Sequence, residues 1–498
     1  MKTSPGLDRT RIVSLALVES RPLRGTCYAS SMIAERDVER QSARLRKELT
    51  LPSLVLTQVL SIMGLAWVGT AGKLGASHLF FWLAAIVFFY LPSAAVVIHL
   101  NREMPLEGGL YQWAKLRFNE MTGFLVAWNL WLYAIAQLSE MGLVAVNNLS
   151  YALGPSGAWL ATSKFAIAAA SVVITLILVA VAAMGLALGK WIHGFGGFMI
   201  LALFAAMAFF ALPQWLRGAV AHVPIALTIP ALSLFNLNIL GKMGFGAMGG
   251  FDTVAIFAGE CRGKDVAVPI RRSVWIATPI IAGAFILGTA CVLVFVRPAD
   301  IDLITPITQV LKRGMQALGV SGPIVTAAIA MIIITRIGQA ALVFAATCRL
   351  PMVAGWDHLL PAWFTRLHPR HRTPTGSIAF MGIVTMICAL LASLGVGNQE
   401  AYQLLQNAGG VAYALCYLVM FVIPLIGRGE KTPLWLRLAS LSGFAMTLLY
   451  VVLAVFPIVA VQNRLAFTAK ISGVVIAMNL AGALYFRQAE NRRAPRSV

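Results

Sequence analysis

Long apolar runs recur along the chain from residue 51 onward, separated by short stretches that carry most of the charges. An α-helix needs about 20 apolar residues to cross the hydrocarbon core of a bilayer, and these runs have that length. The pattern therefore predicts an all-α integral membrane protein with twelve transmembrane helices. The predicted spans lie near 52–72, 79–100, 119–149, 163–184, 191–212, 236–258, 273–296, 322–348, 375–395, 400–426, 438–459 and 466–487.

The two ends of the chain do not share this pattern. Residues 1–50 are rich in charge and hold no long apolar run, so they are expected to form a disordered cytoplasmic tail. The transmembrane domain is expected over 51–487 and a cytoplasmic C-terminal tail over 488–498. Met32 is an alternative start to Met1, because the segment before it has no structural pattern.

Composition and charge agree with a membrane protein. The chain is 59% hydrophobic and only 12% charged, which is too little charge to cover a soluble domain. In a soluble protein the net charge of +20 would suggest nucleic acid as a partner. Here most lysine and arginine residues fall in alternate loops and in the two tails, which predicts a multi-pass protein of the plasma or inner membrane with both termini cytoplasmic. We therefore expect membrane lipids, and no nucleic acid, as partners.

Motifs of the common soluble chemistries are missing from the sequence. It has no phosphate-binding loop, no zinc-protease motif and no nucleophile elbow, and its six cysteines form no paired motif. The sequence predicts neither an enzyme nor a cofactor or metal site.

The sixth span has an unusual density of glycine. Gly244, Gly246, Gly249 and Gly250 fall within seven positions, and Asp252 follows. Glycine is unfavourable inside a helix, so this cluster predicts either an interruption of the helix or very close packing through small residues. An interruption within the membrane exposes polar backbone groups, which is tolerated only against protein or a polar cavity. The first span carries a weaker form of the same signal around Gly64.

Four stretches of the chain, in order, are similar to motifs of one family. They are 61–64 in the first span, 101–111 after the second, 249–260 in the sixth and 359–374 after the eighth. In these stretches the chain resembles amino acid permeases of the amino acid–polyamine–organocation superfamily. The resemblance implies the leucine-transporter-type fold, with a 5+5 inverted repeat and two peripheral helices. It also implies a substrate between spans 1, 3, 6, 8 and 10.

Three positions depart from the pattern of that family. Its first helix has glycine, any residue, glycine after the break, where this chain has Gly64, Leu65 and Ala66. Its sixth-helix acid is usually glutamate, where this chain has Asp252. Gly246 aligns near the position where some relatives place a gating aromatic residue.

The resemblance and the physics of broken helices together predict the site. Amide groups at a helix break suit a carboxylate and free carbonyl groups suit an ammonium. The predicted substrate-binding residues are Met63, Gly64, Leu65, Ala66, Gly246, Met248, Gly249, Gly250 and Phe251. The coupling or gating candidates are Asp252, Glu140, Arg336, Trp67 and Phe245.

Charged side chains inside the spans carry separate expectations. Asp252 is expected either to couple a proton or to stabilise the broken helix through hydrogen bonds. Glu140 and Arg336 are expected to face one another, because a lone charge at that depth is costly; separate positions near water are the alternative.

These features predict a secondary active transporter of amino acids or closely related amines that works by alternating access. Proton-coupled symport and solute exchange are both open. A polyamine or decarboxylation-product antiporter is the alternative within transport, in which Asp252 and Glu140 receive a second ammonium. A nutrient sensor with a transporter fold is the alternative class.

Overall fold

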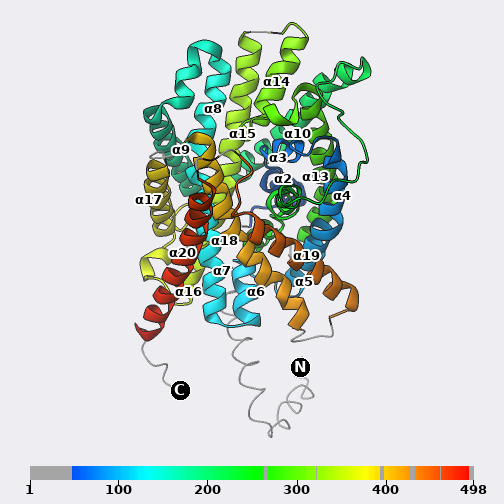
Figure 1. Ribbon diagram of the computed structural model, residues 1–498. Helices are drawn as coiled ribbons and strands as arrows, with labels where there is room; N and C mark the ends of the chain where they lie inside the picture. The colour runs from blue at the N-terminus through cyan, green and yellow to red at the C-terminus, as the bar shows by residue number, and fades with distance from the viewer. Residues whose placement is uncertain are drawn as a thin grey trace, which may run out of the picture.

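The computed structural model describes residues 47–262, 267–320, 322–392, 397–426, 432–459, 461 and 463–492. Within these residues the chain is helical, and the only β-type pairings are two isolated bridges. Figure 1 shows the helices as one bundle, with α6 and α16 at its lower end and α14 at its upper end. The predicted all-α class is confirmed.

Ten helical segments of the described residues are long and apolar enough to cross a membrane. Each one overlaps a predicted span, and together they account for every predicted span except the first and the sixth. They comprise α4 (His78–Ala85) with α5 (Leu91–Glu103), α7 (Glu120–Ser139) with α8 (Met141–Leu153), α9 (Lys164–Met184), α10 (Leu186–Leu216), α13 (Ala267–Phe295), α15 (Pro323–Thr347) with α16 (Arg349–Trp356), α17 (Thr375–Ala392), α18 (Asn398–Ile426), α19 (Leu434–Leu453) and α20 (Arg464–Arg492).

The first predicted span is broken. Helix α2 (Leu51–Ile62) ends before Met63, and α3 (Trp67–Gly72) begins after a four-residue non-helical segment. The interruption falls where the sequence places Gly64, so this predicted break is confirmed.

The sixth predicted span is broken as well. It consists of α11 (Leu234–Gly241), a π-helical segment η6 (Lys242–Gly246) and, after a turn at 249–251, the short α12 (Asp252–Ile256). Gly250 has φ +138°, a conformation that side chains rarely adopt. A Cβ there would also lie 2.9 Å from Ile62 Cγ1, so this glycine lets the two breaks lie against each other.

Two helices occupy segments that the sequence assigned to loops. They are α6 (Leu110–Arg117) and α14 (Pro306–Ala317). Both are too short to cross a bilayer, and they pack on the bundle instead. The helical part of the chain is completed by the π-helix Ile86–Tyr90 and by short 3-10 helices at Gly75–Ser77, Gly154–Thr162, Ala258–Glu260, Pro298–Asp300 and Ala362–Thr365.

Most of the predicted N-terminal tail, residues 1–46, lies outside the described residues. Its last four residues are packed: Lys47 Nζ donates to the Gly259 carbonyl at 2.6 Å, and Leu49 pairs with Cys261. The C-terminal helix α20 continues to Arg492, into the predicted C-terminal tail.

Candidate functional site

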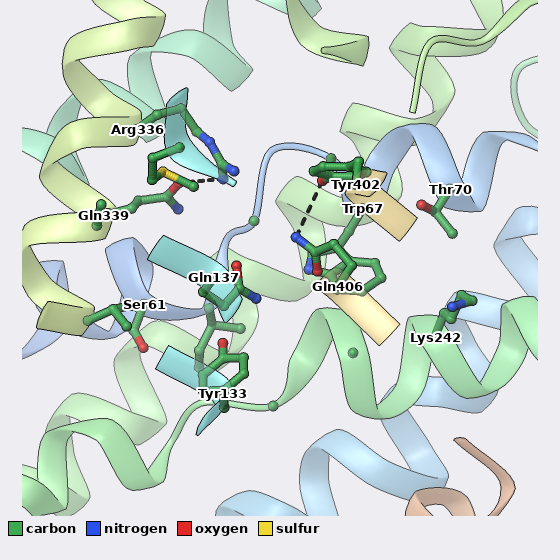
Figure 2. Close-up of a pocket in the computed structure, with 18 of the residues that line it drawn as sticks. Ser61, Trp67, Thr70, Tyr133, Gln137, Lys242, Arg336, Gln339, Tyr402 and Gln406 are labelled. Carbon is green, nitrogen blue, oxygen red and sulfur yellow. Dashed lines mark hydrogen bonds between the residues drawn. The ribbon is translucent and has the colours of Figure 1, made fainter. Parts of the chain in front are cut away.

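A cavity lies between the two broken helices and three helices that pack around them. Its wall includes Gly64, Ala66 and Trp67 from the first break and Gly246 and Gly249 from the second. The rest comes mainly from α7, α15 and α18, as Figure 2 shows. The polar and charged side chains of the wall are Ser61, Thr70, Tyr133, Gln137, Lys242, Arg336, Gln339, Tyr402, Gln403, Gln406 and Asn407.

Gln339 satisfies the backbone at the first break. Its Nε2 donates to the carbonyls of Leu60 and Met63, both at 3.0 Å, where α2 stops. These carbonyls have lost their helical partners, so a side-chain amide replaces the missing bonds. On the other side of the break, the amides of Leu65 and Ala66 find no acceptor among the described residues. The break therefore presents free N–H groups beside the cavity wall.

Glu140 and Arg336 meet beside the cavity. Arg336 Nη2 lies 3.5 Å from Glu140 Oε1, and Gln406 Nε2 lies 2.8 Å from each carboxylate oxygen. Arg336 Nη1 also donates to Gln339 Oε1 at 3.0 Å, which links the ion pair to the first break. The Glu140 side chain is fully buried, whereas Arg336 lines the cavity. The predicted pairing of these two charges is confirmed.

Asp252 stabilises the second break through hydrogen bonds to α18. The hydroxyls of Tyr413 and Tyr417 donate to its Oδ1 at 2.5 and 2.6 Å, and Tyr417 Oη in turn accepts the Gly250 amide at 2.9 Å. Both tyrosines come from α18, so this carboxylate ties α12 to that helix. Asp252 is buried and is not part of the cavity wall.

Lys242 is not among the predicted site residues, yet it begins the π-helical segment η6 and lines the cavity. Its Nζ donates to Asn407 Oδ1 at 2.6 Å, and it lies 5.8 Å from the centre of the Tyr450 ring. The rule that drew attention to Glu140 and Arg336, an ionisable group inside an apolar span, applies equally to this lysine.

The predicted site residues divide into two groups. Gly64, Ala66, Gly246, Gly249, Trp67 and Arg336 line the cavity. The others are buried around it and do not form its wall in the described structure: Met63, Leu65, Met248, Gly250, Phe251, Phe245, Asp252 and Glu140.

The Trp67 ring fills the space that a side chain at position 246 would occupy. A Cβ on Gly246 would lie 2.7 Å from the Trp67 ring, and a Cβ on Gly64 would lie 2.5 Å from it. The glycine in the sixth span and the aromatic residue in the first therefore complement each other. Phe245, the other predicted gate, packs instead against aromatic rings of Tyr417 and Tyr450, at 5.2 and 5.0 Å.

Two of the stretches that resemble family motifs, 101–111 and 249–260, meet away from the cavity. Arg349 Nε lies 2.6 Å from Glu260 and 3.8 Å from Glu107, and Glu107 accepts the Gly259 amide at 2.7 Å. All three side chains are buried. Burial and the neighbouring Glu260 carboxylate raise the pKa of Glu107, against the opposing effect of Arg349. Arg349 lies closer to Glu260 than to Glu107, so it chiefly balances the Glu260 carboxylate.

The family model described as amino acid permease matches residues 48–479. This range includes both broken helices, the cavity and the buried charges of Arg349, Glu260 and Glu107, here called the Arg349 cluster. The chain belongs to the amino acid permease family. This membership agrees with the broken helices and the polar cavity between them, and it makes the chain a multi-pass membrane transporter rather than an enzyme.

Three curated relatives illustrate the place of this permease in the family. An uncharacterized transporter of Legionella pneumophila is 23% identical over 396 residues, covering 78% of this chain and 82% of its own. The probable agmatine/putrescine antiporter AguD of Lactococcus lactis is 19% identical over 386 residues, covering 76% and 78%. The chloroplastic cationic amino acid transporter 7 of Arabidopsis thaliana is 27% identical over 156 residues, covering 30% and 24%.

Proposed function

We propose that this permease is a secondary active carrier of amino acids or closely related amines that works by alternating access. The observation that carries the proposal is the cavity between two helix breaks, with polar side chains on its wall. A zwitterion that leaves water must have both of its charges satisfied, and free backbone groups at helix breaks can do this inside a membrane.

We infer twelve membrane crossings. The ten continuous segments supply ten of them, and the two broken helices supply the first and the sixth. Breaks at the first and sixth positions are five crossings apart, as expected if helices 1–5 and 6–10 form two inverted halves. With an even number of crossings and most basic residues in alternate loops and the tails, we propose that both termini lie in the cytoplasm and that the protein lies in a plasma or inner membrane.

In this proposal the backbone holds the amino acid. The amides of Leu65 and Ala66 receive its carboxylate, and carbonyls at 248–250, of which that of Gly250 also accepts the Thr253 amide at 3.1 Å, receive its ammonium. The substrate then spans the short gap between the breaks. This arrangement explains why glycine or alanine occupies the cavity wall at 64, 66, 246 and 249.

Gly249→Leu is expected to abolish uptake while the protein still reaches the membrane. A Cβ at this position would lie 2.8 Å from the Phe245 carbonyl oxygen and would add bulk to the cavity wall. The measurement is uptake by proteoliposomes with and without a pH gradient, over a panel of amino acids, agmatine and putrescine. Gly473→Leu is the matched control, because Gly473 is exposed and a Cβ there meets nothing. Unchanged uptake by Gly249→Leu would count against this site.

The name of the Lactococcus relative supports the alternative of a polyamine or decarboxylation-product antiporter. A diamine needs a second acidic group, and Asp252 and Glu140 are the candidates. The Asp252 carboxylate accepts two tyrosine hydroxyls, and Glu140 is paired with Arg336. The charged side chains that line the described cavity, Lys242 and Arg336, are both cations. The geometry therefore favours amino acids over diamines.

Coupling to protons is proposed through Asp252. Asp252→Asn is expected to make uptake insensitive to the pH gradient, because the amide does not take up a proton. The measurement is the pH profile of uptake by proteoliposomes, with Tyr417→Phe as the comparison that keeps the carboxylate and removes one of its hydrogen bonds. A full pH dependence in Asp252→Asn would assign Asp252 to support of the broken helix alone.

A further inference from the structure

The ammonium of Lys242 has little compensation for its charge. The residue is 2% exposed, and its one hydrogen bond goes to Asn407, a neutral side chain. Among the described residues no carboxylate lies within ion-pair distance of Lys242. A cation in a low-dielectric interior normally has an anionic partner, and the described residues give Lys242 a neutral amide and the ring of Tyr450, so this position suits an anion from elsewhere.

The acidic groups nearest to the cavity are already engaged. Glu140 binds Arg336 and Gln406, and Asp252 accepts two tyrosine hydroxyls. Figure 2 shows Lys242 and Arg336 on opposite sides of the cavity, with Gln406 between them. The Glu140 carboxylate is therefore placed to balance Arg336 and not Lys242.

Hydrogen-bond donors outnumber acceptors around Lys242. Its ammonium has three N–H groups and one acceptor, and the buried Nδ2 of Asn407 has no partner among the described residues. The side-chain oxygen of Gln403, one helical turn away on α18, is a buried acceptor of the same wall that also has no partner among the described residues. The group that complements this end of the cavity is rich in acceptors and negatively charged.

We propose that Lys242 and Asn407 receive a second carboxylate of the substrate, so that the carrier selects amino acids with an acidic side chain. The inference rests on the proposed function, in which the break at Leu65 and Ala66 holds the first carboxylate. A carboxylate supplies both the charge and the acceptors that this end of the cavity lacks. Basic amino acids and diamines would instead place a cation against Lys242.

The test compares acids with amides of nearly the same size. Binding of L-glutamate and L-aspartate, and of L-glutamine and L-asparagine, is measured by thermal shift on the purified full chain and by uptake into proteoliposomes. The wild type is expected to prefer the acids. Lys242→Met is expected to weaken the acids roughly thirtyfold to a thousandfold, the usual cost of removing one partner of a buried charge pair, and to leave the amides nearly unchanged. Lys470→Met is the matched control, because Lys470 lies outside the cavity and its side chain is 49% exposed.

The possible outcomes separate the two proposals. An unchanged ratio of acid to amide in Lys242→Met, or a wild type that binds glutamine as tightly as glutamate, overturns the role of Lys242. If the wild type takes up only neutral or basic amino acids, the role of Lys242 is also overturned, but the proposed carrier function is not. A folded, monodisperse wild type that neither binds nor transports any solute overturns the carrier proposal itself.

If Lys242→Met does not fold, Lys242→Arg provides the test. This variant keeps the charge and is expected to keep the preference for acids. Loss of that preference in folded Lys242→Arg contradicts a charge-based role.

Discussion

Arg336→Met is expected to destabilise the protein by about 3–5 kcal/mol, the cost typical of leaving one member of a buried ion pair without its partner. Glu140 would remain fully buried, with Gln406 as its remaining partner among the described residues, and Gln339 would lose the guanidinium that holds its oxygen. Because Gln339 caps the first break, the loss is also expected to reduce uptake. The measurement is the midpoint of unfolding in detergent, together with uptake by proteoliposomes.

A double variant shows whether the pair itself is responsible. Glu140→Gln removes the charge but keeps the size and a polar group for Gln406. In the Arg336→Met background it is expected to recover much of the lost stability, because no unpaired charge remains. If the double variant is as unstable as the sum of the two single variants, the two residues act independently and the pairing argument is wrong.

Arg349→Met is expected to cause a loss of similar size, about 3–5 kcal/mol. It removes the cation that lies 2.6 Å from Glu260 and stacks 4.9 Å from the centre of the Phe257 ring. The buried Glu260 carboxylate would then lose its ion-pair partner, and the contact between α16 and the end of the sixth span would weaken. The measurement is again the unfolding midpoint in detergent, with the yield of folded protein from membranes.

Arg102→Met is the control for this variant. Arg102 also pairs with a glutamate, Glu103, at 3.1 Å, but its side chain is 63% exposed. An exposed ion pair contributes little because water and salt screen it, so the unfolding midpoint is expected to stay close to that of the wild type. Equal losses from Arg102→Met and Arg349→Met would mean that burial does not set the cost, which contradicts the role given to the Arg349 cluster.

The sequence was sufficient to predict the helical membrane class and the places of the broken helices. Apolar runs have a length that the bilayer dictates, and each was readable without knowledge of its neighbours. The glycines around Gly249 and Gly64 marked the breaks for a similarly local reason, since glycine disfavours a helix wherever it occurs. The pairing of Glu140 with Arg336 also followed from a local rule, the cost of a lone charge in lipid.

The composition of the cavity wall required the tertiary structure. Leu65 and Ala66 are adjacent, as are Gly249 and Gly250, yet in each pair only one residue lines the cavity. Side-chain directions repeat regularly in a helix or a strand, but a break is neither. The sequence therefore cannot predict which residues of a break face the cavity. Some of the predicted site residues therefore line the cavity, and others lie behind its wall.

Partners distant in sequence were decided by tertiary packing as well. Tyr413 and Tyr417 lie one helical turn apart in an apolar span, and nothing local indicates that they bind Asp252. Gln339 and Lys242 likewise gain their roles only when α15 and α18 pack against the broken helices. The sequence by itself determined the membrane-spanning helices, their two breaks and the charges that need partners. Only the tertiary structure decided which groups meet those needs, because hydrogen bonds and ion pairs depend on distances between helices that are far apart along the chain.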